Sequence, residues 1–297
     1  MFAEPRKVSS ISDCHFYHSI DIPDHGHAAG DWDLRGRENE YLGGVDLAGK
    51  TVLEIGTANG YLCFWMERQG AHVTAYDLSD EHEWDLVPYA SINLSDLAQG
   101  RRAHIRSINN AWWFAHERFK SKARVAYGTA YDVSDRLGRF DVVTLSCILL
   151  HLRDPFLAMQ RAASAAADTL IVTDRAPADW PSARANDGRV VRFLPDAHRC
   201  EPLETWWQLT PEFVAETLRV LGFGDVTTVH HQQRCQGNLV DLFTIVARRS
   251  AAAPNRAQPA VMQPPNDSYG LHDEILGRIP ARQIVRHLTG RVWKKLR

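Results

Sequence analysis

Short apolar runs separated by polar turns recur along the middle of the chain and predict buried β-strands. VLEI, FDVVTLS and TLIVT are near-continuous apolar segments of the length and composition typical of strands covered on both faces. The predicted strands lie at about 51–56, 72–77, 123–128, 140–146 and 169–173, with two more at about 224–230 and 239–248.

Between these strands the apolar residues follow helical spacing. Helices are predicted at about 60–69 and 101–121, and Trp112, His116 and Phe119 share one face of the second. A further helix begins near Asp154-Pro155, and another begins with Thr210 as N-cap. The alternation of strands and helices predicts an α/β fold with a parallel sheet.

The turn after the first strand carries the most informative chemistry. It reads Glu54-x-Gly56-x-x-x-Gly60, and the second strand ends in Asp77. Glycines let the backbone approach a ligand closely, and a carboxylate at a strand end can accept hydrogen bonds from two ribose hydroxyls. Because the G-x-G-x-x-G pattern that cradles a pyrophosphate is absent, the turn favours a nucleoside and argues against a dehydrogenase.

On these residues the chain resembles the class I S-adenosylmethionine (SAM) methyltransferases over about residues 45–248. The resemblance implies a Rossmann-like seven-stranded sheet with helices on both faces and an antiparallel last pair. It also implies that the glycine turn faces the methionine part of SAM and that Asp77 holds the ribose. The SAM-binding residues predicted in this way are Glu54, Gly56, Thr57, Ala58, Asn59, Gly60, Asp77, Leu78, Tyr131, Asp132 and Ser146.

Two of these positions depart from the family pattern. Many relatives carry Gly-Asp after strand three where this chain has Gly128-Thr129, so we expect Asp132, with Tyr131, to contact adenine instead. Metal-dependent relatives place an acid at the end of strand four. Strand four here ends in Ser146, so no catalytic Mg²⁺ is expected.

Methyl transfer to an alcohol requires removal of the hydroxyl proton and in-line positioning of the oxygen. His151, in the loop after strand four, is the first candidate for the general base because imidazole accepts a proton at neutral pH. His116 is the second candidate, and Asp174 could orient a base or bind substrate. Each could also be a packing or capping residue.

Residues 1–44 have little regular period, and their mixed aromatic, histidine and acidic residues favour a cap over the pocket; a surface arm is the alternative. Residues 175–207 form a long Pro- and Asp-rich connection that could be a lid or substrate insertion. Tryptophans near predicted pocket loops suit a flat acceptor such as a sugar ring. The predicted substrate-binding residues are His18, His25, Trp32, Trp112 and Arg175.

The net charge of the chain limits the classes of binding partner that are expected. The net charge of −2 makes nucleic acid an unexpected partner, although Arg101-Arg102 begins a basic run on one helix. Five scattered cysteines and a polar, acid-containing start favour the reducing cytoplasm. The 14 histidines make zinc conceivable, but ligand spacing is poor and no metal is predicted.

The end of the chain differs in composition from the rest. Residues 250–270 are rich in Ala, Pro and Gln and predict a flexible linker after the 45–249 methyltransferase domain. Residues 271–297 predict a basic amphipathic helical tail, which could lie on the inner membrane face, on a partner protein or on its own domain.

Together these observations predict a SAM-dependent methyltransferase acting on a sugar, nucleotide-sugar or glycan hydroxyl. Two alternatives remain open. A tRNA-modifying methyltransferase would bind RNA with a steep salt dependence. A non-catalytic module of the same fold would turn over no SAM. The oligomeric state is not predicted.

Overall fold

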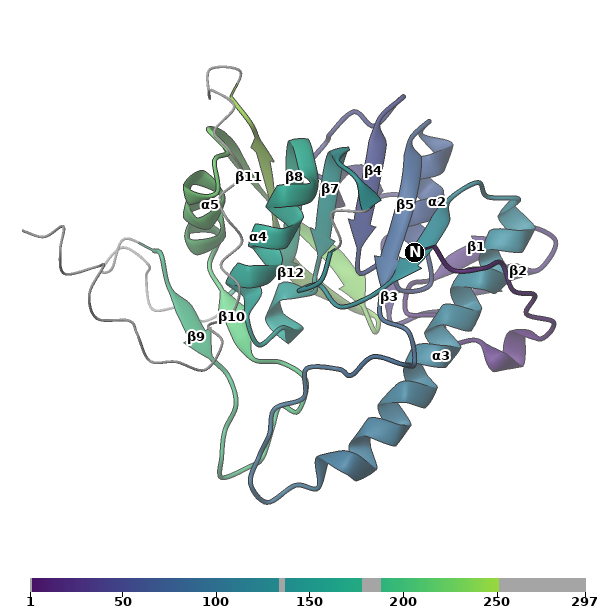
Figure 1. Ribbon diagram of the computed structural model, residues 1–297, viewed down its shortest axis with the longest axis horizontal. Coiled ribbons are helices and arrows are strands. Elements are labelled where there is room, and N and C mark those ends of the chain that lie inside the picture. Colours follow the sequence, from purple (N-terminus) through teal and green to yellow (C-terminus); the bar gives the residue numbers. More distant parts are fainter. Residues whose placement is uncertain (1, 134–136, 178–187, 251–297) are drawn as a thin grey trace, which may run out of the picture. The chain divides into compact units, whose positions relative to one another are not determined.

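The computed structural model describes residues 2–133, 137–177 and 188–250, which contain an eight-stranded mixed sheet (Figure 1). The strand order is β3-β11-β12-β8-β7-β4-β5-β6. The strands are β3 Trp32–Asp33, β4 Thr51–Ile55, β5 His72–Asp77, β6 Arg124–Tyr127, β7 Phe140–Ser146, β8 Ala166–Arg175, β11 Asp225–Cys235 and β12 Asn238–Arg248. β4 to β8 are parallel, and β12 runs antiparallel to both of its neighbours. The predicted Rossmann-like α/β fold is confirmed.

The sheet has one strand more than the seven expected. β3 pairs antiparallel with the end of β11, where Trp32 faces Cys235 and Asp33 faces Arg234. A two-residue strand is too short to leave an alternating pattern in the sequence. The N-terminal segment therefore contributes to the sheet itself.

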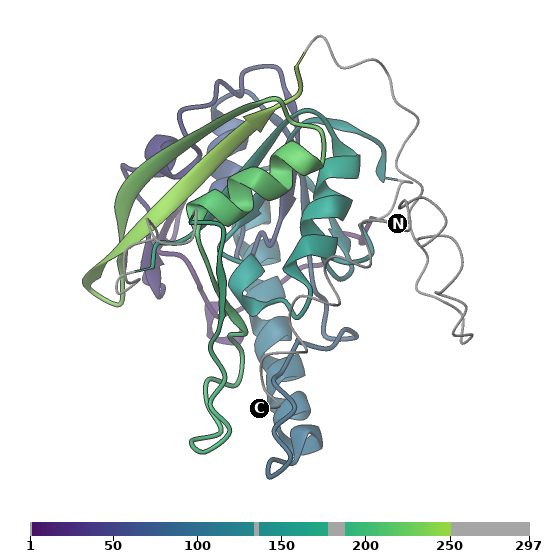
Figure 2. The same cartoon turned by 90° about the vertical axis from the view of Figure 1, so that its left-hand side faces the viewer.

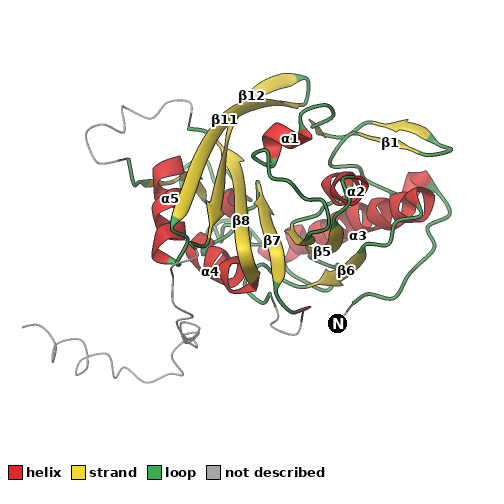
Figure 3. Cartoon of the chain, turned by 90° about the horizontal axis from the view of Figure 1, so that it is seen from above, coloured by secondary structure: helices red, strands yellow, loops and turns green. Residues whose placement is uncertain are grey.

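Helices cover both faces of the sheet, as predicted (Figure 3). They are α1 Glu38–Tyr41, α2 Tyr61–Arg68, α3 Leu94–Phe119, α4 Pro155–Ala165 and α5 Pro211–Val220. Neighbouring residues of β4 enter different cores: Val52 packs in the core that contains α2 and α3, whereas Leu53 packs in the core of α4 and α5. Burial on both faces explains the near-continuous apolar runs.

Two helices begin at the N-caps that the sequence predicts, and a third begins earlier than predicted. Asp154 caps α4 by accepting a hydrogen bond from the Leu157 N–H, and Thr210 caps α5 by accepting one from Phe213. α3, however, begins at Leu94 rather than near residue 101, because Asn93 caps it. Leu94, Leu97 and Ala98 in its first two turns follow helical spacing and are half-buried, so the prediction missed a signal that the sequence carries.

Residues 2–44 fold onto the domain. They form the 3₁₀ turn Ile11–Asp13, the hairpin of β1 Ile20–Ile22 and β2 Gly26–Ala28, then β3 and α1. Hydrogen bonds join them to the domain, because Ala3 N donates to Val125 O and His15 N to Ser107 O. The predicted cap is thus part of the same compact unit as the sheet.

Two loops, residues 79–93 and 194–206, lie beyond the edge of the sheet and are hydrogen-bonded to each other. We call these two loops the cover. Val87 N donates to Leu203 O at 2.9 Å, and the Trp206 indole N–H donates to Asp85 O at 2.8 Å. The second loop links the paired strands β9 Val191–Phe193 and β10 Trp207–Leu209. The cover and the start of α3 extend from the sheet in the same direction (Figures 1 and 2).

Parts of the predicted organisation lie outside the described residues. These are most of the 250–270 linker, all of the 271–297 tail, and residues 178–187 of the 175–207 insertion.

Candidate active site

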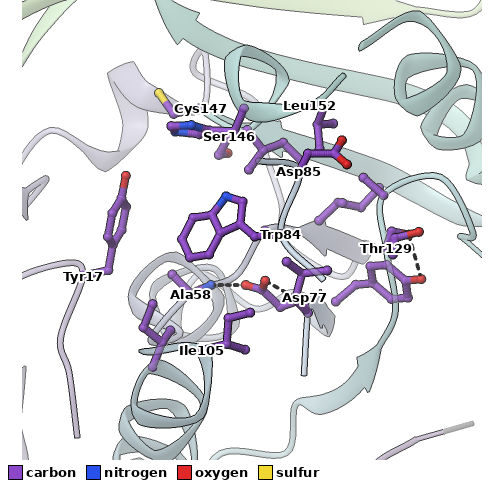
Figure 4. A pocket seen from close by; sticks show the side chains of 18 of the residues that line it. Tyr17, Ala58, Asp77, Trp84, Asp85, Ile105, Thr129, Ser146, Cys147 and Leu152 are labelled. Carbon is purple, nitrogen blue, oxygen red and sulfur yellow. Dashed lines mark hydrogen bonds between the residues drawn. The ribbon is translucent and has the colours of Figure 1, made fainter. Parts of the chain in front are cut away.

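A cavity of about 550 Å³ lies at the carboxyl ends of the parallel strands, under the cover (Figure 4). Its wall includes the residues that end or follow β4, β5, β6 and β7, namely Gly56, Asp77, Gly128 and Ser146. This is the edge of an open α/β sheet where ligands bind.

Asp77 is fixed at this wall by two backbone hydrogen bonds. Ala58 N donates to Oδ2 at 2.6 Å, and Leu78 N donates to Oδ1 at 2.7 Å. Burial raises the pKa of Asp77, and the two hydrogen bonds oppose that rise. Each carboxylate oxygen retains a further lone pair, so the group can still accept from two ligand hydroxyls.

The two glycines of the turn serve different purposes. Gly56 lines the cavity at φ +87°, and a Cβ added there would lie 2.5 Å from Ile148 Cγ2. Gly60 does not line it. A Cβ at Gly60 would lie 2.6 Å from the Phe64 ring and 2.7 Å from the Trp112 ring. Gly60 therefore allows aromatic packing in this structure, and its expected contact with SAM stays a prediction.

Three more residues of the predicted SAM site lie behind the turn. Glu54 is 2% exposed, burial raises its pKa to about 8, and it accepts a hydrogen bond of 2.5 Å from Thr57 Oγ1. Asn59 is fully buried and bonds the backbone of His18. These three stabilise the turn rather than line the cavity, whereas Ala58 and Leu78 do line it.

Tyr131 and Asp132 line the end of the cavity proposed for adenine. The Tyr131 hydroxyl donates to the Asp85 carboxylate and accepts from Asp154 N at 3.2 Å. Asp132 Oδ2 accepts from Thr129 Oγ1 at 2.9 Å. The departure from the family's Gly-Asp pattern therefore leaves an acid within this wall.

His151, the first candidate for the base, lies in the 3₁₀ turn Leu149–His151 and lines the cavity. Its Nδ1 is 2.6 Å from the carbonyl oxygen of Glu204, and because a carbonyl only accepts, Nδ1 carries the hydrogen. Burial lowers the pKa of His151 to about 4, and Arg175 adds to this effect. The ring is therefore neutral at pH 7, with Nε2 free to accept a proton.

The other two catalytic candidates lie outside the cavity lining. The His116 ring stacks on Trp112 at 4.7 Å, and its Nε2–H donates to Ala123 O, so it packs within the α3 core. Asp174 is 2% exposed and accepts from Arg175 N, and burial raises its pKa to about 7. Its other oxygen, Oδ2, has no partner within the described residues.

The predicted substrate residues divide into two groups. His18 and Trp32 line the cavity and are 8% and 7% exposed. Trp112 is buried under Gly60, and Arg175 and His25 are exposed, with His25 set edge-on against Phe114. These last three do not line the cavity. Helical spacing and position in the chain did not show in which direction their side chains point.

Several lining residues carry no signal in the sequence. Tyr17 and Tyr41 come from the N-terminal segment, whereas Trp84, Asp85 and Glu204 come from the cover. Cys147 also lines the cavity. Trp84 extends into the middle of the cavity in Figure 4 and stacks on His104 at 6.1 Å. Tryptophan content was the hint available from the sequence, and among the described residues Trp32 and Trp84 are the tryptophans that line the cavity.

The basic run on α3 is paired with acids. Arg101 forms an ion pair with Glu204, Arg102 Nη2 lies 3.3 Å from Glu83 Oε1, and Arg106 Nε lies 2.6 Å from Asp80 Oδ2. All three acids belong to the cover. This side of the helix therefore binds the protein's own loops.

Within the described ranges, no group of three or more His, Cys, Asp or Glu side chains could hold a metal ion. In the same residues, no helix combines the length and apolar character needed to cross a bilayer. The five cysteines are free thiols.

Comparison with known proteins identifies the family. A family model described as a methyltransferase domain matches residues 33–218, more than half of the chain. The ubiquinone biosynthesis O-methyltransferase of Pseudomonas paraeruginosa is 32% identical over 110 residues, which cover 37% of this chain and 36% of that protein. The matched part thus spans about a third of the relative's length.

Similar solved structures are more distant. Magnesium protoporphyrin IX methyltransferase from Synechocystis, with bound S-adenosylhomocysteine (SAH), is 16% identical with a TM-score of 0.45, over 69% of this chain and 76% of that one. The N-terminal domain of EvdMO1, solved in the presence of SAH and D-fucose, is 15% identical with a TM-score of 0.46, over 78% and 90%. On the strength of the match over residues 33–218, the chain belongs to the methyltransferase-domain family.

Proposed function

We propose that the protein transfers the methyl group of SAM to a hydroxyl group of a small acceptor, with His151 as general base. The observation that carries the proposal is the hydrogen bond from His151 Nδ1 to Glu204 O, which leaves Nε2 as an acceptor in the cavity. Family membership and the O-methyltransferase activity of the ubiquinone-pathway relative support the same reaction class.

The residues of the cavity fit this donor. Asp77 would hold the ribose, Tyr131 and Asp132 would contact the adenine, and Gly56 lies in the cavity wall, where its lack of a Cβ leaves room for Ile148 beside it. When bound, SAM supplies a methyl group already activated by the positive sulfur. The protein must then orient the acceptor oxygen and remove its proton, which His151 Nε2 accepts as the O–CH₃ bond forms.

For the acceptor we propose a sugar hydroxyl. Trp32, Trp84 and Tyr17 line the cavity with flat apolar faces, on which a sugar ring can stack. Asp31 and His104 add polar groups that can hydrogen-bond sugar hydroxyls. RNA is not our proposal, because Arg101, Arg102 and Arg106 of α3, which would have to meet phosphates, are paired with the cover.

Calorimetry with SAH, followed by a mass-spectrometric acceptor screen, tests the proposal. The screen would contain free sugars, nucleotide sugars, phenols and tRNA, and a product would show the mass gain of one CH₂ group. We expect a methylated sugar with the wild type and a rate roughly 10²–10⁴ lower with His151→Gln, at unchanged SAH affinity. No SAH binding, or an equal rate for His151→Gln, would contradict the proposal; a methylated phenol would correct the acceptor alone.

A further inference from the structure

The wall of the cavity is rich in acids and poor in cations. Among the described lining residues the only Arg or Lys is Arg153. Six lining residues carry a carboxyl group, namely Asp31, Asp77, Glu83, Asp85, Asp132 and Glu204. The lining histidines add no positive charge at pH 7, because burial lowers the pKa of His18, His104 and His151. The electrostatic field of the cavity therefore favours a cation over an anion.

Most of these carboxyl groups already have a partner or a proposed ligand. Three form ion pairs with arginines, which are Glu83–Arg102, Asp85–Arg153 and Glu204–Arg101. Asp77 and Asp132 line the part of the cavity proposed for the nucleoside. Asp31 remains, and within the described residues no Arg or Lys pairs with it.

The backbone holds Asp31 in place and leaves its carboxylate lightly engaged. Gln236 N donates to Asp31 O at 2.7 Å, and the next residue, Trp32, pairs with Cys235 in the sheet. The carboxylate itself accepts from the Gln236 amide at 3.3 Å and lies 4.0 Å from the His15 ring. It is partly exposed at the cavity wall, so a ligand can reach it.

The surroundings of Asp31 are aromatic. Trp32 N donates to Tyr17 O at 3.0 Å, and the Trp32 indole N–H donates to the Tyr17 hydroxyl at 3.2 Å. Both rings line the cavity, as does Trp84. Figure 4 shows Tyr17 across Trp84 from Thr129, which bonds Asp132 at the end proposed for adenine. The N-terminal segment thus lines the end of the cavity away from the adenine.

A carboxylate beside aromatic faces is suited to an ammonium group. The carboxylate accepts charge-assisted hydrogen bonds from it, and the ring faces attract the same cation. A neutral sugar would stack on the rings but would not use the charge of Asp31. A phosphate would be repelled, since the lining guanidinium of Arg153 is paired with Asp85.

We propose that the acceptor is an amino sugar without a phosphate group, and that Asp31 binds its ammonium group. This inference deepens the proposed function and rests on it. A protonated amine has no lone pair, so Asp31 also keeps the nitrogen from being methylated. The hydroxyl oxygen forms the bond to the methyl carbon, the carbon–sulfur bond breaks with its electron pair left on sulfur as SAH, and His151 Nε2 takes the hydroxyl proton.

Matched acceptors provide the test. Glucosamine, galactosamine and mannosamine would be compared with their N-acetyl derivatives, with the parent hexoses and with the hexose 6-phosphates. The value of kcat/KM would be measured for the wild type and for Asp31→Asn, which keeps the shape and removes the charge. Asp24→Asn, an exposed position of the same segment outside the cavity lining, is the matched control. Calorimetry with SAH reports separately on the donor.

We expect a hexosamine to be the best substrate and a hexose phosphate the worst, with the methyl group on oxygen. Asp31→Asn should lower kcat/KM for the hexosamine roughly three- to tenfold, because the carboxylate is partly exposed. The parent hexose and SAH affinity should change less than about twofold, and Asp24→Asn should change nothing.

The other outcomes separate this inference from the proposed function. A preferred hexose phosphate, or an equal effect of Asp31→Asn on hexosamine and hexose, would overturn the inference alone. Weaker SAH binding by Asp31→Asn would assign the residue to the donor and overturn it as well. A wild type that binds SAH but methylates no sugar, or that methylates nitrogen, would count against the proposed function itself.

Discussion

The Nδ1 atom of His151 lies 2.6 Å from the carbonyl oxygen of Glu204, fifty-three residues further along the chain. This one contact fixes the tautomer of the proposed base and connects it to the cover. Glu204 is in turn paired with Arg101 on α3. The orientation of the imidazole therefore depends on a loop and a helix outside the β7 segment that carries it.

The low pKa of His151 predicts the pH dependence of the reaction. A base must be neutral, so the rate should be constant above about pH 5 and fall as the pH drops through about 4. Because Arg175 helps to lower this pKa, Arg175→Ala should move the acid limb to higher pH. Arg219→Ala, on the distant α5, is the control. An acid limb near pH 7 in the wild type would contradict this assignment.

Loss of Arg101 should loosen the cover. Its guanidinium pairs with Glu204 and lies 5.6 Å from the centre of the Trp84 ring. We expect Arg101→Gln to lower kcat roughly two- to fivefold, the effect of one partly exposed ion pair, with SAH affinity retained. Hydrogen exchange within 194–206 should become faster. Arg102→Gln, which pairs with exposed Glu83, should change neither measurement.

Asp77→Asn tests the ribose contact. The amide preserves the shape of the side chain but removes the charge and one of the two acceptors. Hydrogen bonds to charged groups are the stronger ones, so SAH should bind roughly 10- to 100-fold more weakly by calorimetry. Asp132→Asn, in the same cavity, should have the smaller effect. The reverse order would place the ribose at the other carboxylate.

Asp174→Asn should change how stability depends on pH. Burial raises the pKa of Asp174 to about 7, so the folded state binds more protons than the unfolded state from about pH 4 to about pH 7. This group's contribution to stability is therefore lost as the pH rises through that window and is constant above it.

Denaturant unfolding at pH 4.5 and pH 8 checks this prediction. Relative to the wild type, the free energy of unfolding of Asp174→Asn should rise by a few kcal/mol between the two pH values, since each pH unit within the window contributes about 1.4 kcal/mol. Asp168→Asn, which lies near the start of the same strand, is a suitable control. A pH-independent difference between Asp174→Asn and the wild type would show that Asp174 is ionised when folded.

The sequence predicted the strands and helices well wherever burial produces a regular spacing of apolar residues. Each predicted strand is present. The parallel strands leave near-continuous apolar runs because they are covered on both faces, whereas β11 is mostly exposed. Asp154 and Thr210 start helices because they cap them. The start of α3 and the strand β3 were missed. The start of α3 has a short apolar spacing, Leu94, Leu97 and Ala98, that the prediction missed, and β3 is too short to show alternation.

Part of the site was predicted from residues that are close together in the sequence, and His18, Trp32 and His151, expected from other segments, also line the cavity. Asp77 and Gly56 belong to one strand–turn–helix–strand unit, so spacing alone places them together. Trp84 and Glu204 reach the cavity through hydrogen bonds between loops more than a hundred residues apart. Gly60 was recognised, but a glycine in a sequence does not show that its lack of a Cβ leaves room for the Trp112 ring.

The attachment of residue 18 by Asn59 uses only main-chain atoms, N–H and C=O. Any amino acid except proline, which lacks the N–H, can keep this anchor, and the side chain at this position lines the binding cavity. Evolution or a protein engineer could exchange it to tune recognition without rebuilding the scaffold, which makes position 18 the natural first choice for a saturation library.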